Sequence, residues 1–248
     1  MRKLKTICTS KIKRFLLSQG YFVSNLRKIS PLYSLMFECI QKNQCLNVVQ
    51  IGANDGKSFD PIYDFLTIYH RQINAVLVEP IKEYHAQLSE NYAQFPTIKT
   101  KRCAIHKSNS SMSIFKVDSD NYPDLPAWTK GIASFNEQHH TLTGIPPEAI
   151  VEELVDCITF EKLLNDSNMP SLDLLQIDTE GYDAQIIKEI DFESTKPNII
   201  HFEHGLNENV IDKETLRYVI NLLKEQGYEI WWEAHDVTAY QPQIMVDL

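Results

Sequence analysis

Short apolar runs alternate with amphipathic stretches along most of this 248-residue chain. A run of four to six apolar residues that ends at Gly, Pro or an acid is typical of a strand buried on both faces. Apolar residues at three- and four-residue spacing indicate a helix instead. Strands that alternate with helices predict an α/β fold with a largely parallel sheet, and the chain is long enough for one such domain.

The pattern places the elements as follows. The expected strands are residues 46–51, 75–78, 98–105, 155–158, 172–178, 197–204 and 228–234, with residues 238–248 returning as the final edge strand. The expected helices are residues 32–40, 61–69, 81–92, 160–164, 183–190 and 212–227. Between them, "SMSIFKVD" (residues 111–118) alternates like an exposed, hairpin-paired strand. Residues 119–150 hold four prolines and two glycines, and such a long irregular insertion is typical of a lid or binding loop.

Charge is distributed unevenly. Residues 1–37 contain eight Lys or Arg and no acid, whereas the rest of the chain has 16 basic and 33 acidic residues. An acidic body argues against nucleic acid as a partner. The basic start suits a membrane surface or another anionic partner, and the alternative is a solvated lead-in with helices over residues 1–45.

The remaining composition favours a cytoplasmic protein. The five cysteines are odd in number and form no CxxC pair, so neither a disulfide framework nor a zinc motif is indicated. No apolar run approaches the roughly 18 residues of a membrane span. Charged residues also interrupt any signal-peptide core near the N-terminus. The sequence does not specify an oligomeric state.

Polar residues follow four of the expected strands at their carboxyl ends, where open α/β sheets bind ligands. "VVQI" runs into "GANDG" (residues 52–56), and Glu79 follows the second strand. Two carboxylate oxygens on Glu79 can accept hydrogen bonds from both hydroxyls of a ribose. The loop lacks the GxGxxG of dinucleotide sites, and its acid would repel phosphate but attract an ammonium or sulfonium. These features favour S-adenosylmethionine, which carries both cations and no phosphate.

The motifs "VVQIGANDG", "LVEP", "LLQIDTEGYDAQII" and "GYEIWWEAHDVTAY" resemble, in this order, those of the FkbM family of S-adenosylmethionine-dependent methyltransferases. That family usually shows a hydrophobic strand followed by GAN-x-G, then EP, then a "KIDVEG"-like motif. The resemblance covers roughly residues 46–240. Gln176 stands where lysine is common and Thr179 where valine is common, but neither change removes a carboxylate.

The resemblance implies an α/β class I methyltransferase (Rossmann-like) fold with a seven-stranded, mostly parallel sheet. Residues 46–248 would form the methyltransferase domain, with residues 119–150 as its lid or substrate insertion. The implied reaction methylates a hydroxyl, often on a saccharide or a secondary metabolite. The implied cofactor residues are Gly52, Asn54, Asp55 and Gly56 around the methionine part, Glu79 at the ribose, Cys103 and Ala104 at the adenine, and Asp178 and Glu180 at the reacting end. In the insertion, the candidate substrate residues are Trp128, Ser134, Phe135, His139 and His140.

An alcohol is a poor nucleophile until something accepts its proton. His204 is the first choice for this base because an unperturbed histidine has a pKa near 6.5. Asp178, Glu180 and Glu203 are the alternatives. These four side chains also allow a divalent metal ion, although the motif spacing does not require one. Two further classes of function stay open: an NAD(P)-dependent oxidoreductase, and a non-catalytic binding protein of the same fold.

Overall fold

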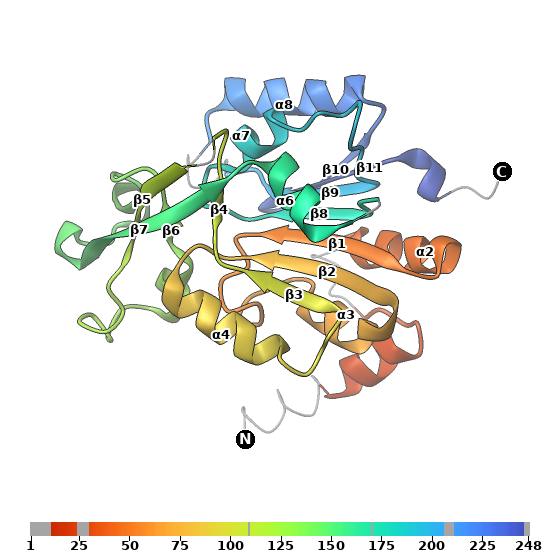
Figure 1. The fold of residues 1–248 in the computed structure, drawn as a ribbon, viewed down its shortest axis with the longest axis horizontal. Coiled ribbons are helices and arrows are strands. Elements are labelled where there is room, and N and C mark those ends of the chain that lie inside the picture. The colour runs from red at the N-terminus through yellow and green to blue at the C-terminus, as the bar shows by residue number, and fades with distance from the viewer. Residues whose placement is uncertain (1–10, 24–29, 109, 170, 206–210, 246–248) are drawn as a thin grey trace.

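The computed structural model describes residues 11–23, 30–108, 110–169, 171–205 and 211–245 (Figure 1). In this part of the chain, seven strands form one sheet in the order β10-β11-β9-β8-β1-β2-β3. Their bounds are β1 (Leu46–Ile51), β2 (Ile73–Val78), β3 (Ile98–Lys101), β8 (Leu174–Ile177), β9 (Ile199–Glu203), β10 (Glu229–Trp232) and β11 (Asp236–Tyr240). Strand β1 pairs in parallel with β2 on one side and with β8 on the other. In turn, β2 pairs in parallel with β3, and β8 pairs in parallel with β9. The predicted seven-stranded, mostly parallel sheet is therefore confirmed.

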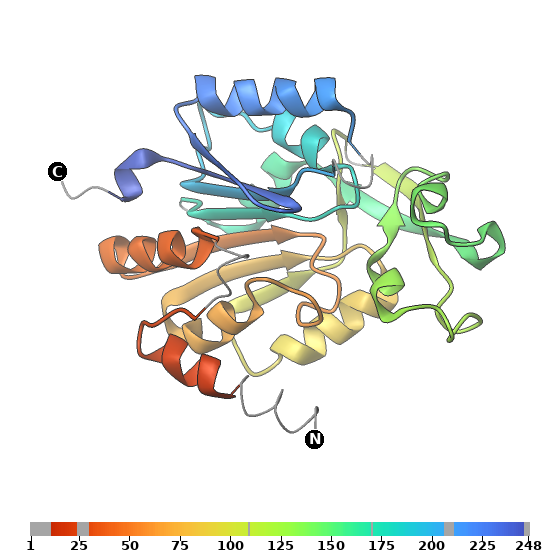
Figure 2. The same cartoon turned by 180° about the vertical axis from the view of Figure 1, so that it is seen from behind.

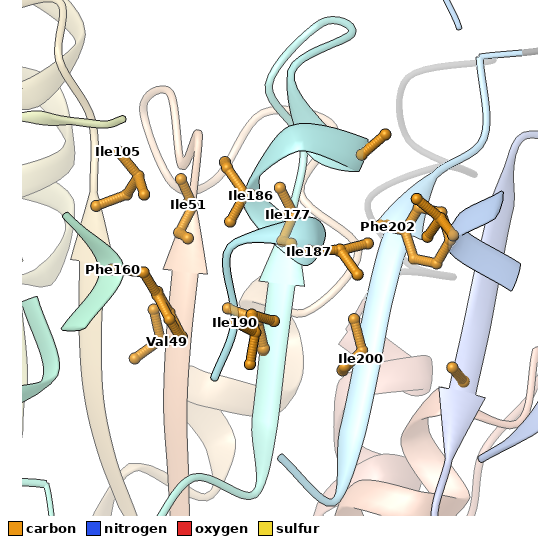
Figure 3. Close-up of a cluster of buried hydrophobic side chains, with 14 of the residues drawn as sticks. Val49, Ile51, Ile105, Phe160, Ile177, Ile186, Ile187, Ile190, Ile200 and Phe202 are labelled. Carbon is orange, nitrogen blue, oxygen red and sulfur yellow. The ribbon is translucent and has the colours of Figure 1, made fainter. Parts of the chain in front are cut away.

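Helices cover both faces of this sheet (Figures 1 and 2). They are α2 (Leu32–Asn43), α3 (Tyr63–Ile68), α4 (Lys82–Tyr92), α6 (Phe160–Ser167), α7 (Asp183–Lys188) and α8 (Lys213–Glu225). Successive side chains of a strand point to opposite faces. Val49 and Ile51 of β1 accordingly pack with α6, α7 and α8, whereas Leu46 and Val48 pack with α2, α3 and α4. Figure 3 shows the first of these two clusters. Burial on both faces explains why β1 is an almost continuous apolar run.

Local sequence signals set the limits of α8. Asp212 Oδ1 accepts hydrogen bonds from the backbone N–H groups of Glu214 and Thr215, at 3.0 and 2.8 Å. This capping begins the helix. Apolar side chains at helical spacing then face the sheet, and the helix ends before Gly227, which has a φ of +82°. The predicted helix over residues 212–227 is confirmed within two residues at each end.

A second sheet stands beside the first, with strand order β4-β7-β5-β6. It contains β4 (Ala104–Ile105), β5 (Ser110–Val117), β6 (Ala133–Ser134) and β7 (Ile150–Ile158). The sequence predicts one strand over residues 98–105, but the chain leaves the main sheet after Lys101 and joins this second sheet as β4. The partner of β5 is β7, which runs antiparallel to it along all eight residues of β5. Because β7 begins at Ile150, the insertion is the connection between two paired strands.

The insertion between β5 and β7 has its own small core. It contains η2 (Ala127–Gly131), β6, α5 (His140–Thr143) and η3 (Pro147–Ala149). Ile132, Ile145 and Ala149 are buried together with Val117 at the end of β5. The segment is therefore a packed structure rather than an irregular loop.

The prediction that residues 238–248 form the edge strand is wrong. Strand β11 lies between β9 and β10, and it is antiparallel to both, so β10 is the edge strand. Val237, Thr238 and Ala239 of β11 are all buried, whereas β10 exposes Trp231 and Trp232. The backbone of β11 is paired with β10 on one side and with β9 on the other, which places β11 inside the sheet.

The N-terminal lead-in is described only in part. Residues 11–18 are helical, whereas residues 1–10, Cys8 among them, and residues 24–29 lie outside the described residues. Within the described ranges, no helix is long and apolar enough to cross a membrane. The four described cysteines, Cys39, Cys45, Cys103 and Cys157, carry free thiols.

The packing around positions 52 and 56 requires a glycine at both. Gly52 has a φ of +79°, and a Cβ atom there would lie 1.7 Å from the backbone oxygen of Asp178. Gly56 has a φ of +66°, and its Cβ would meet side chains of Leu88 and Tyr92 on α4. The loop after β1 can therefore lie against the ends of β8 and α4 only if both positions lack a side chain.

We predict that Gly52→Ala lowers the free energy of unfolding by at least about 3 kcal/mol, because the methyl group collides with rigid backbone. Gly144→Ala is the matched control, since Gly144 also has a positive φ (+71°) but no atom lies within 4 Å of its Cβ position. This control should lose only about 1 kcal/mol, the cost of the left-handed conformation. Urea unfolding of both variants measures the difference, and equal losses would contradict the proposed collision.

Candidate functional site

The carboxyl ends of β1, β2 and β8 open into two adjoining cavities. The cavities share six lining residues: Gly52, Asn54, Tyr84, Gly131, Asp178 and Glu180. One is narrow and lined largely by apolar side chains, and we call it the apolar compartment. The other, which we call the polar cleft, has a volume of about 890 Å³. The sheet edge that the sequence selected is therefore hollow.

Glu79 lines the apolar compartment and is only 4 % exposed. Its Oε2 accepts a hydrogen bond from the N–H of Asn54 at 2.9 Å, and its Oε1 accepts one from the N–H of Ile81 at 2.8 Å. Burial is the main reason why its pKa is raised to about 7. Each oxygen keeps a second lone pair, so the carboxylate can still accept bonds from a ligand diol.

The walls of the apolar compartment suit a flat ring. Cys103 and Ala104 line it, together with Ile105. Phe135 from the insertion packs edge-on against Tyr182, with ring centroids 5.1 Å apart. The compartment thus offers stacking and apolar contact beside a carboxylate, a combination that fits a nucleoside.

Acidic side chains surround the junction of the two cavities. Asp178 lines both cavities, and its side chain is open to them. The pKa of Asp178 is raised well above its ordinary value, first because the surrounding protein desolvates the carboxyl group and then because Glu180, Asp183 and Glu203 repel its charge. The resulting negative potential favours a cationic ligand at this point.

Asp55 and Gly56 help to fix the conformation of the loop after β1, so they do more than form a surface for a ligand. Asp55 Oδ1 accepts bonds from the N–H groups of Lys57 and Ser58, and its Oδ2 accepts one from the hydroxyl of Ser58 at 2.6 Å. Asp55 lines the polar cleft, but Gly56 lines neither cavity. Gly56 supports the loop from behind through its contact with α4.

Three polar contacts attach the insertion to the loops after β1 and β8. The hydroxyl of Ser134 donates to the backbone oxygen of Glu180 at 3.2 Å, and His139 Nε2 lies 3.2 Å from Glu180 Oε2. The amide of Asn54 donates to the backbone oxygen of Lys130 at 3.2 Å. Glu180 itself has a φ of +52°, a conformation that L-residues rarely adopt. These contacts hold the insertion as a wall of both cavities.

The predicted substrate residues of the insertion therefore occupy different places. Trp128 lines the polar cleft and Phe135 the apolar compartment, whereas Ser134 and His139 line neither and bind Glu180 instead. His140 Nδ1 lies 2.9 Å from the backbone oxygen of Glu137, within the insertion itself.

His204 lies beside the polar cleft, but it is not among the residues that line it. The residue is buried, its N–H donates to the backbone oxygen of His235 at 2.9 Å, and its ring lies 6.0 Å from that of Trp232. Glu203 and His235 do line the cleft. The assignment of His204 as the base stays a prediction, and the lining favours a carboxylate.

Asp183 is a structural part of the site that the sequence analysis read only as the start of a helix. It is fully buried, and its Oδ2 accepts bonds from the hydroxyl of Thr179 at 2.6 Å and from the N–H of Thr179 at 3.1 Å. Its Oδ1 accepts a bond from the N–H of Glu203 at 3.3 Å. Asp183 thus joins the loop after β8 to the end of β9. The sequence feature that could have revealed this role is an acid on the buried face of a short helix.

The model of the FkbM methyltransferase domain matches residues 50–230, well over half of the chain. The chain belongs to the FkbM methyltransferase family. Its sheet order, with β11 as the antiparallel strand, is accordingly the class I methyltransferase fold. The protein is a methyltransferase.

Other comparisons add little. The curated proteins contain no match to this chain. Among solved structures, an O-methyltransferase from Bacillus cereus is 9 % identical with a TM-score of 0.42, covering 88 % of this chain and 84 % of that one. A precorrin-6y C5,15-methyltransferase from Geobacter metallireducens is 12 % identical with a TM-score of 0.41, covering 90 % and 96 %.

The site of this FkbM methyltransferase fits S-adenosylmethionine by the chemistry of its side chains. Acceptor oxygens, apolar walls and nearby acids match a ribose, an adenine and a sulfonium in turn. The polar cleft also contains unpartnered buried oxygens, on Gln50 and Gln176. Gln176 and Thr179 are the two departures from the family pattern, and Thr179 uses its hydroxyl to bind Asp183.

A divalent metal finds no support in the described residues. No group of three or more His, Cys, Asp or Glu side chains among them could hold a metal ion.

Asp60 lies in the wall of the polar cleft, and it allows a test of how burial of an acid affects stability at different pH values. Its Oδ1 accepts a bond from the N–H of Ile62 at 2.8 Å, but its Oδ2 is buried without a partner, and burial raises its pKa from 3.8 to about 7. The folded state therefore binds a proton more tightly than the unfolded state, so this group makes the protein less stable as pH rises from about 4 to about 7.

We predict that Asp60→Asn removes this dependence, because the amide has no charge to desolvate. The variant should match the wild type near pH 4 and exceed its free energy of unfolding by about 4 kcal/mol at pH 8. Urea unfolding at several pH values measures the difference. A difference that is the same at pH 4 and pH 8 would contradict the assignment to Asp60.

Proposed function

We propose that this FkbM methyltransferase transfers a methyl group from S-adenosylmethionine to a hydroxyl oxygen, with a saccharide or a similar polyhydroxylated molecule as acceptor. The position of Asp178 carries the proposal. Its carboxyl group lies where the apolar compartment meets the polar cleft, and its raised pKa makes it a stronger proton acceptor than an ordinary aspartate.

The apolar compartment is the proposed cofactor site. Glu79 would accept bonds from the ribose hydroxyls, and the walls around Ala104 and Phe135 would enclose the adenine. Asp178 and Glu180 would face the sulfonium. S-adenosylmethionine supplies a methyl group on a positively charged sulfur, so the donor is already activated.

The protein then has two tasks. It aligns the acceptor oxygen with the methyl group, which is worth ~7–11 kcal/mol in well-oriented reactions. It also accepts the proton of the hydroxyl, and Asp178 is placed to do so. Asp183 holds the loop that carries Asp178 through its bonds to Thr179. Asp183 is therefore a positioning residue.

Features of the polar cleft support a polyhydroxylated acceptor. Trp128 and Phe59 line it with their side chains largely exposed, and Phe59 has a φ of +62°, which is strained for an aromatic residue. Gln50 and Gln176 have unpartnered side-chain oxygens in the same cleft. Aromatic faces beside hydrogen-bond acceptors suit a ring that carries several hydroxyl groups.

Two measurements test the function. Calorimetry should show binding of S-adenosylmethionine and none of NAD. A panel of saccharides and hydroxylated small molecules should then yield S-adenosylhomocysteine with at least one acceptor, and NMR of that product should show the new methyl on oxygen. Methylation at nitrogen or carbon would overturn the hydroxyl assignment while leaving the methyltransferase assignment intact.

We predict that Glu79→Ala weakens S-adenosylmethionine binding by at least about tenfold, because the diol loses its acceptor and the loop after β1 loses its bond. Glu90→Ala is the matched control, since Glu90 is an exposed acid of α4 that lines neither cavity. Calorimetry measures both affinities. Unchanged affinity in Glu79→Ala would place the cofactor elsewhere.

We predict that Asp178→Asn lowers kcat by at least about 100-fold, because an amide cannot accept the proton. Binding of S-adenosylhomocysteine, which lacks the sulfonium charge, should stay within about threefold of wild type. His204→Ala is measured in parallel on the best acceptor of the panel. A large loss in His204→Ala beside near-normal turnover in Asp178→Asn would make the histidine the base.

A further inference from the structure

Five large apolar side chains are exposed in one short N-terminal segment, and we call them the N-terminal patch. They are Ile12 (53 % exposed), Phe15 (65 %), Tyr21 (66 %), Phe22 (48 %) and Val23 (45 %). Ile12 and Phe15 are three residues apart, so they share one side of the helix over residues 11–18. A concentration of apolar side chains of this kind on a surface indicates a contact with something else.

The helix that carries the patch is fixed to the rest of the protein by its other side. Leu17 is buried against α2 and α3, and the hydroxyl of Tyr69 donates to the backbone oxygen of Leu17. Arg14 pairs with Asp64 and donates to the hydroxyl of Thr67 at 3.1 Å. The helix is therefore held in a fixed orientation, and Ile12 and Phe15 are exposed on its outer side.

Positive charge accompanies these apolar side chains. Lys11 and Lys13 are exposed on the same helix, and the sequence places Arg2, Lys3 and Lys5 before it and Arg27 and Lys28 after it. The rest of the chain is strongly acidic. An anionic surface would attract this end of the molecule and repel the remainder, which would also orient the protein.

We propose that the N-terminal patch docks on the surface of an anionic lipid bilayer. Exposed aromatic and aliphatic side chains beside lysines are the combination that binds the interface between headgroups and acyl chains. A second copy of the chain is a poorer occupant, because two basic ends would repel each other. A hollow next to the patch is lined by Leu17, Phe22 and Phe65 among others, and Glu38 is the one acid among the described residues of its wall.

The patch lies away from the proposed catalytic cavities. In both Figure 1 and Figure 2 the helix over residues 11–18 lies below α3, and the insertion that walls the cavities lies at the opposite side of the molecule. Docking through the patch would therefore leave the polar cleft open. Substitutions in the patch should not alter cofactor binding.

Vesicle flotation of the full chain tests the proposal. The wild type should float with vesicles of equal parts phosphatidylglycerol and phosphatidylcholine, and not with pure phosphatidylcholine. The double variant Ile12→Ser, Phe15→Ser should lower the bound fraction by about tenfold, and Lys11→Gln, Lys13→Gln should lower it less and make it less sensitive to salt. Leu154→Ser is the matched control, since Leu154 is 69 % exposed on β7, and it should bind as the wild type does.

Three results would overturn the proposal. The wild type could stay in solution with the anionic vesicles, or Leu154→Ser could reduce flotation as much as the double variant does. Light scattering could also show a wild-type dimer that becomes monomeric in the double variant, which would make a second copy the occupant. Unchanged S-adenosylmethionine affinity and an unchanged thermal unfolding temperature in each variant show that the fold is intact. A failure of the membrane-docking proposal can therefore be distinguished from a failure of the proposed methyltransferase site.

Discussion

The close approach of backbone at the ends of β1 and β8 is the constraint on which the site depends. Gly52 lies so near the backbone oxygen of Asp178 that no side chain fits between them. The N–H of Gly52 donates to Val78 at the end of β2, and the N–H of Asp178 donates to Ile51. Three strands are thus joined just where they end, which brings Glu79 and Asp178 to the rim of common cavities.

Burial of acids at this rim has opposing consequences. Desolvation raises the pKa of Glu79, Asp60 and Asp178, so their ionised forms make the fold less stable at neutral pH. For Glu79, which is buried, the same desolvation strengthens the attraction for a cation, because little water screens it. The proposed site, which would hold a sulfonium and accept a proton, would benefit from both effects. Stability lost locally is supplied by the two large apolar clusters on either face of the sheet.

The second sheet determines how the site is closed. Paired strands β5 and β7 carry the insertion at their far end, and a small core around Ile132 and Ile145 keeps it folded. Hydrogen bonds from Ser134 and His139 then attach it to Glu180. The acceptor would therefore meet a preformed wall. The hydrogen bonds between the insertion and the loops of the main sheet run through a few residues.

The sequence by itself determined the main sheet, because strands buried on both faces must be apolar throughout, and it determined which acids lie at strand ends. Glu79, Asp178, Glu180 and Glu203 all line the cavities as that reasoning requires. Tertiary structure alone decided the rest. It placed β11 inside the sheet, paired β5 with a strand 33 residues further along the chain, left His204 outside the cleft lining and gave Asp183 its role. These features depend on contacts between residues distant in sequence, and local periodicity carries no information about which distant partner a strand or side chain will meet.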